Sequence, residues 1–108
     1  MLILFDNGTP APLRHALGEH TVVEAIDRGW DRLVNGELIA AAEREGFDVL
    51  LTTDKNMRYQ QNLKNRRIAF IVLGNQQWPV LRRHVDRVLA AIEVSTPGSY
   101  YEVEIPFE

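Results

Sequence analysis

The chain has 108 residues, a length that fits one compact domain with a modest core, and it contains no cysteine. Disulfides and thiolate metal sites are therefore excluded, and any metal site must use oxygen or imidazole ligands. The net charge of −3 taken alone argues against nucleic acid binding. No apolar run approaches the roughly 20 residues of a membrane span, and no signal peptide is visible. We therefore expect a cytoplasmic protein that does not associate with membranes.

The charges are unevenly distributed along the chain. The window from Lys55 to Val85 contains no acid and carries a formal charge of +7. Its basic residues are Lys55, Arg58, Lys64, Arg66, Arg67, Arg82 and Arg83. A basic window beside an acidic site would let a polyanion such as RNA approach a metal-binding cluster. The same residues could equally form the solvated faces of two helices and a loop.

The first half of the chain alternates between predicted strands and helices. Residues 2–5 form a continuous apolar run, typical of a strand buried on both faces. Thr9 and Pro10 are typical of a helix start, with Thr9 as the cap and Pro10 as the first helical residue. Residues 20–25 predict a short second strand, and residues 37–45 predict a helix with one apolar face.

The alternation continues in the second half. Apolar runs predict buried strands at residues 48–53 and 68–73, with a short helix at 56–63 between them. Residues 78–92 carry apolar side chains at three- and four-residue spacing and predict one helix. Residues 99–106 alternate in the manner of a half-buried edge strand. Short connections throughout predict a single α/β sandwich with a mostly parallel sheet.

Three acidic residues lie at the ends of these elements. Asp6 follows the first strand, Asp54 follows the third strand, and Glu37 lies in the first turn of a helix. In open α/β sheets, ligands bind at the carboxyl ends of the strands. Carboxylates without thiolates suit Mg²⁺ or Mn²⁺, which can polarise a phosphodiester and lower the pKa of a bound water. The pattern therefore predicts a divalent metal site.

Each acid also has a simpler interpretation. The helix dipole favours Glu37 in a first turn by about 0.3–1 kcal/mol. Asp54 could cap a helix that begins near Asn56, and Asp6 could be a turn residue. Nucleotide-binding, serine-hydrolase and zinc sites have little support, because the chain lacks a phosphate-binding glycine loop, a nucleophile elbow and a zinc-type histidine pair. Three acids beside a basic window favour the functional interpretation.

Three segments together resemble a known family. They are Leu4-Phe5-Asp6-Asn7, Gly29-Trp30 followed by Asn35-Gly36-Glu37-Leu38, and Leu50-Leu51-Thr52-Thr53-Asp54-Lys55-Asn56. Over about residues 2–92 the chain resembles the small bacterial PIN-like proteins of the DUF5615 group, within the wider class of PIN-domain ribonucleases. The resemblance implies a PIN-like three-layer α/β/α sandwich over residues 1–108. It also implies a ribonuclease site in which Asp6, Glu37 and Asp54 bind Mg²⁺ or Mn²⁺.

The resemblance further implies a bacterial toxin–antitoxin module, with RNA as the substrate and a small antitoxin protein as the partner. We expect a metal-dependent endoribonuclease with Asp6, Glu37, Asp54 and Lys55 in catalysis. Substrate-binding roles are expected for Asn7, Asn56, Asn75, Arg58, Lys64, Arg66 and Arg67. The family pattern has a fourth acid after the next strand, where this chain has Asn75 and no carboxylate.

Two alternatives follow from the same sequence. A catalytically degenerate PIN-like module would bind RNA or protein without cleaving RNA. A phosphatase or nucleotide-binding α/β protein has less support, because the chain lacks a phosphate loop and an Asp-x-Asp pair. The alternating segment 101–105 could also pair edge to edge in a homodimer.

Overall fold

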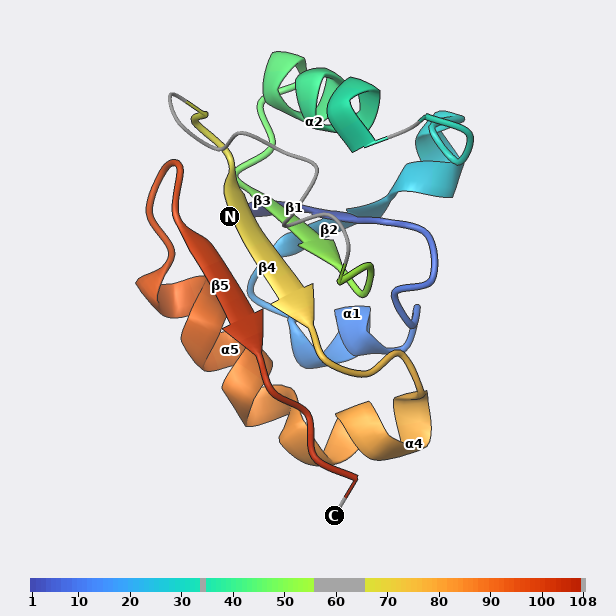
Figure 1. Cartoon of the computed structure of the whole chain (residues 1–108), viewed down its shortest axis with the longest axis vertical. Coiled ribbons are helices and arrows are strands. Elements are labelled where there is room, and N and C mark those ends of the chain that lie inside the picture. Colours follow the sequence, from blue (N-terminus) through green and yellow to red (C-terminus); the bar gives the residue numbers. More distant parts are fainter. Residues whose placement is uncertain (34, 56–65, 108) are drawn as a thin grey trace.

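The computed structural model describes residues 1–33, 35–55 and 66–107 (Figure 1). Five strands form one sheet: β1 (Leu2–Phe5), β2 (Thr21–Glu24), β3 (Val49–Thr52), β4 (Ala69–Leu73) and β5 (Tyr100–Val103). Their order is β2-β1-β3-β4-β5, and every neighbouring pair is parallel. The predicted α/β class with a mostly parallel sheet is confirmed, and β5 lies at one edge as expected.

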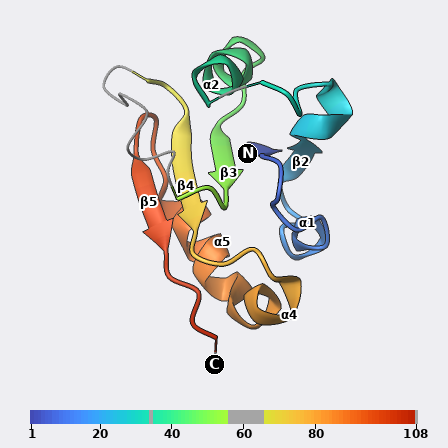
Figure 2. The same ribbon diagram turned by 45° about the vertical axis from the view of Figure 1, so that its right-hand side comes forward.

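Helices cover both faces of the sheet. The described helices are α1 (Leu13–Ala16), η1 (Ala25–Arg28), α2 (Asn35–Arg44), α4 (Trp78–Leu81), η2 (Arg82–His84) and α5 (Val85–Val94). The turned view separates α2, on one side of the sheet, from α1, α4 and α5 on the other (Figure 2). The architecture is consistent with the predicted three-layer α/β/α sandwich.

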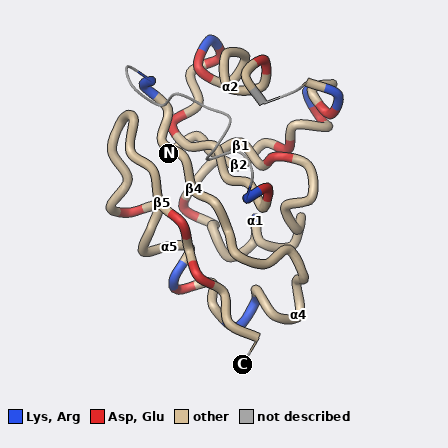
Figure 3. The backbone as a smooth tube through the Cα atoms, viewed as in Figure 1, with Lys and Arg blue, Asp and Glu red and all other residues tan. Residues whose placement is uncertain are grey.

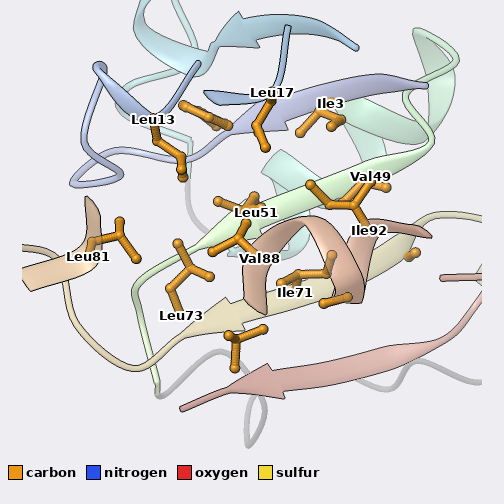
Figure 4. Close-up of a cluster of buried hydrophobic side chains, with 14 of the residues drawn as sticks. Ile3, Leu13, Leu17, Val49, Leu51, Ile71, Leu73, Leu81, Val88 and Ile92 are labelled. Carbon is orange, nitrogen blue, oxygen red and sulfur yellow. The ribbon is translucent and has the colours of Figure 1, made fainter. Parts of the chain in front are cut away.

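The central strands are apolar throughout because both of their faces are buried. Ile3 and Leu51 belong, with Val88 of α5, to the larger of two hydrophobic clusters (Figure 4). Leu50, the neighbour of Leu51, faces the opposite way and packs in a second cluster with Ile39 of α2. Burial of each such side chain stabilises the fold by about 1.5–3 kcal/mol. Continuous apolar runs of this kind are typical of parallel sheets.

The connections β1–α1–β2 and β4–α5–β5 have opposite hands. Both helices pack on the same face, yet the chain crosses the sheet in opposite directions in the two connections. Right-handed crossovers dominate in proteins, so one of these two is an exception. The consequence is that α4 and α5 join α1, and α2 is the one α-helix among the described residues that covers the other face.

Two local predictions are wrong. The first helix begins at Leu13 rather than Pro10, and Thr9 does not cap it, because its buried hydroxyl donates instead to the Leu51 carbonyl at 3.3 Å. The single helix predicted over 78–92 is divided, since His84 leaves the helical region with φ −128° and ψ 24°. Nε2 of His84 lies 3.0 Å from the Pro106 carbonyl oxygen. The helix predicted at 56–63 lies outside the described residues.

Candidate functional site

Asp6 lies where β1 ends at the carboxyl edge of the sheet. Its backbone N–H donates to the Leu51 carbonyl at 3.0 Å and so extends the ladder between β1 and β3. Side chains alternate along a strand, and Leu4 packs in the cluster beneath α2. The same alternation directs the side chain of Asp6 to the α2 face. Each of its carboxylate oxygens accepts a hydrogen bond, Oδ1 from the Asn7 N–H and Oδ2 from the Thr52 hydroxyl, both at 2.8 Å.

Thr52 connects the two acidic segments. It is the last residue of β3 and is completely buried. Its Oγ1 donates to Asp6 and accepts the backbone N–H of Asp54 at 3.0 Å. One buried hydroxyl therefore fixes the carboxylate that follows β1 relative to the chain that follows β3. No separate role was predicted for this threonine, and only its place two residues before Asp54 connects it in sequence to the candidate acids.

The turn after Asp6 is also held close to β3. Gly8 has a φ of 87°, a conformation that favours glycine. A Cβ at this position would lie 3.3 Å from the Thr53 hydroxyl, which is closer than ordinary contact. The Thr9 N–H donates to the Asp6 carbonyl at 3.1 Å and closes the turn. The backbone on both sides of the candidate site is therefore tightly positioned.

The pKa of the Asp6 carboxyl is raised above its ordinary value of 3.8. Burial is the main cause, because it disfavours the charged form, and the negative charge of Asp54 adds to it. The hydrogen bonds from Thr52 and Asn7 act in the opposite direction and are outweighed. A bound cation would stabilise the ionised forms of these two neighbouring carboxylates, which burial and mutual repulsion disfavour.

Glu37 lies in the first turn of α2, as predicted, and its side chain is exposed. Within residues 1–33, 35–55 and 66–107, no three histidine, cysteine or acidic residues form a group that could hold a metal ion. The structure therefore brings Asp6 and Asp54 together without adding Glu37 to the pair. Mg²⁺ commonly binds through one or two carboxylates and keeps several waters, so the pair suits such an ion.

The two predicted asparagines that the structure describes have local partners. The Asn7 amide donates to the Asp31 carbonyl at 2.7 Å and ties the segment before α2 to the site. The Asn75 amide oxygen accepts the N–H of Gln77 at 2.8 Å, within the loop that leads from β4 to α4. Asn56, Arg58 and Lys64 lie outside the described residues.

The predicted basic residues do not all lie at this edge of the sheet. Lys55 directly follows Asp54 and is exposed. Arg66 and Arg67 precede β4, so they lie at the opposite, amino-terminal edge. There, Arg66 forms an ion pair with Glu43 of α2 at 2.7 Å, and the Arg67 N–H donates to the same carboxylate at 2.7 Å. The structure separates these two arginines from Asp6 and Asp54.

Comparisons with protein-family models, curated proteins and solved structures found no match. In the described part of the chain, no helix has both the length and the apolar character needed to cross a membrane.

Proposed function

We propose that this protein is a divalent-metal-dependent endoribonuclease with a PIN-like site. The observation that carries the proposal is the pair of carboxylates, Asp6 and Asp54, linked through Thr52 at the carboxyl edge of a parallel sheet. Ligand sites of open α/β folds lie at this edge. Burial, with a smaller contribution from the charge of Asp54, raises the pKa of the Asp6 carboxyl. Shifted pKa values are common at functional sites, which supports a role for this carboxylate.

Asp6 and Asp54 would hold Mg²⁺ or Mn²⁺, whereas Glu37, which the resemblance implies as a third ligand, is exposed and lies outside this pair. When bound, such an ion would polarise the phosphodiester of the RNA and lower the pKa of a water molecule that it binds. Thr52 keeps the Asp6 carboxylate in place, and the Asn7 N–H binds its other oxygen. Lys55 would contact the phosphate of the RNA, since it directly follows Asp54 and is exposed.

The resemblance supports a biological role as the toxin of a bacterial toxin–antitoxin module. In this proposal RNA is the substrate, a small antitoxin is the partner, and a homodimer could form along the β5 edge. Expression of the wild type should arrest bacterial growth, and expression of Asp54→Asn should not. Normal growth with both proteins at equal levels would contradict the toxin role.

Cleavage of a mixed RNA pool tests the proposed activity. We expect cleavage by the wild type with Mn²⁺ or Mg²⁺, loss of cleavage with a chelator, and loss of cleavage in Asp54→Asn. Glu43→Gln is the matched control, because it also neutralises a partly buried acid but lies at the other edge of the sheet. Cleavage that survives in Asp54→Asn would contradict the proposed site.

The degenerate binding module is the second candidate. It is favoured by the lack of a three-acid group among the described residues. It predicts that RNA binds without cleavage, and that Glu37→Gln changes neither binding nor growth. Reduced cleavage in Glu37→Gln would instead place Glu37 in the working site.

A further inference from the structure

A cavity of about 490 Å³ lies near Asp54 on the carboxyl side of β4 and β5. Its described lining consists of Lys55, Val72, Gly74, Glu102, Val103 and Glu104. The lining therefore combines apolar groups with one ammonium and two carboxylates. Acidic positions follow one another along the end of β5 and the segment after it (Figure 3).

The strand register connects this cavity to the candidate site. Thr52 of β3 is aligned with Val72 of β4, and Val72 is aligned with Glu102 of β5. Neighbouring strands lie about 4.8 Å apart, so Glu102 lies roughly 10 Å across the sheet from Thr52. Lys55 lines the cavity and directly follows Asp54, which makes the two features adjacent.

The two carboxylates of the lining are unsuited to phosphate but suited to the edge of a nucleobase. Two carboxylates would repel the phosphates of RNA, whereas they accept hydrogen bonds from N–H groups on base edges. Glu102 Oε1 accepts the Tyr100 hydroxyl at 2.9 Å, which orients that side chain. The Glu104 side chain is exposed, and no ion pair to its carboxylate is found within the described part of the chain.

Guanine matches a carboxylate better than the other bases do. Its Watson–Crick edge offers two adjacent donors, N1–H and the N2 amino group, to the two oxygens of one carboxylate. Adenine and cytosine offer one amino group each, and the single N3–H of uracil lies between two carbonyls that repel a carboxylate. Single-stranded RNA exposes these edges for recognition.

We infer that this cavity is a base subsite for guanine in single-stranded RNA, next to the phosphodiester that is cleaved. Glu104 accepts the donors of the guanine edge, Glu102 borders the base, and Lys55 binds the adjoining phosphate. This inference rests on the proposed function, because it takes RNA as the ligand. It adds a sequence preference that the carboxylate pair alone does not provide.

Binding of short 2′-O-methyl oligouridylates, with and without one central guanosine, tests the subsite independently of cleavage. In fluorescence anisotropy, the wild type should bind the guanosine-containing strand at least about fivefold more tightly, as expected for a two-hydrogen-bond base contact. Glu104→Gln should lose this preference, because the new amide donor would face the guanine donors. Glu93→Gln, an exposed acid on α5 outside the cavity lining, should retain it.

The same strands with ordinary ribose separate the two proposals. A guanosine preference that Glu104→Gln removes would support the subsite even if no variant cleaved RNA, and in that case the nuclease proposal would fail. Cleavage without a guanosine preference would overturn the subsite and leave the nuclease proposal intact. A preference that persists in Glu104→Gln would also overturn the subsite. Tighter binding of an arginine-rich peptide than of either RNA strand would assign the cavity to a protein partner and overturn it as well.

Discussion

A partly buried carboxylate lies at each end of the parallel strands, and the pKa values of the two carboxyl groups are shifted in opposite directions. At the amino-terminal edge, burial acts to raise the pKa of Glu43, but hydrogen bonds from the Arg67 N–H and the Arg66 guanidinium outweigh it and lower the pKa. At the carboxyl edge, burial and the charge of Asp54 outweigh the hydrogen bonds to Asp6 and raise its pKa. The chain supplies the cation at one edge, and we propose that an external ion supplies it at the other.

The two shifts have opposite consequences for stability. Glu43 binds its proton less tightly in the folded state, so its contribution is present above pH 4.5 and is lost as pH falls through the folded pKa. Asp6 binds its proton more tightly in the folded state. Its contribution is therefore present below pH 3.8 and is lost as pH rises through the folded pKa. Glu43 therefore stabilises the fold when it is ionised, whereas ionisation of Asp6 costs stability when no cation is bound.

The largest expected effect is on cleavage. Asp6→Asn should reduce the cleavage rate by about 100-fold or more, because it removes one of the two carboxylates that would hold the ion, and Glu43→Gln should change the rate by less than about twofold. Rates on one labelled RNA under single-turnover conditions would measure both. Equal losses in the two variants would show that the contrast between the edges is not functional.

Thr52→Val should have the next largest effect. The change keeps the shape of the buried side chain but removes the hydroxyl that binds Asp6 and Asp54. Hydrogen-bond partners of metal ligands typically contribute about 10- to 100-fold to affinity or activity, and we expect a loss of cleavage in that range. Thr53→Val, one residue further along the chain, serves as a control for the added methyl group. If Thr52→Val cleaved RNA at the wild-type rate, the hydroxyl would have no role in positioning the acids.

Glu43→Gln should lower the free energy of unfolding by about 1.5–3 kcal/mol near neutral pH, since it weakens charge-assisted hydrogen bonds from two arginines. Urea unfolding would measure this difference. The difference between wild type and variant should shrink as pH falls through the folded pKa of Glu43. A constant difference across the acidic range would argue against an ionic origin.

The smallest effect is the pH dependence of ion binding. A proton on Asp6 competes with the cation, so Mn²⁺ affinity should fall as pH falls through the raised pKa of this carboxyl, by at most about tenfold per pH unit for one displaced proton. The loss should begin at a higher pH than an ordinary aspartate would give. Affinity that is constant down to pH 3.8 would contradict the proposed competition.

The sequence predicted the sheet and the two strand-end acids because both depend on local patterns. Continuous apolar runs locate β1, β3 and β4, and Asp6 and Asp54 follow two of them directly. The side chain of Thr52 could not be assigned a role in the same way, because threonine is common in strands for its shape alone. Its role depends on a hydrogen bond to a residue 46 positions away.

The distribution of charges along the sequence predicted the positions of residues in the fold less well than the apolar pattern did. Arg66 and Lys55 share one basic window in the sequence, but β4 begins after Arg66, which therefore lies at the edge opposite Asp54. The partner of Arg66 is Glu43, 23 residues earlier, and no periodic pattern indicates that pair. In the same way, Glu102 and Glu104 could be assigned to the polar side of an edge strand, whereas the cavity beside them depends on the arrangement of neighbouring strands.

Calorimetric titration of Mn²⁺ into the wild type, Asp54→Asn and Glu43→Gln tests whether Asp6 and Asp54 form a cation site. We expect one saturable binding event in the wild type, its loss in Asp54→Asn and its retention in Glu43→Gln. Absence of binding at millimolar Mn²⁺ in the wild type, or equal binding by all three proteins, would contradict the claim that the two carboxylates form a cation site.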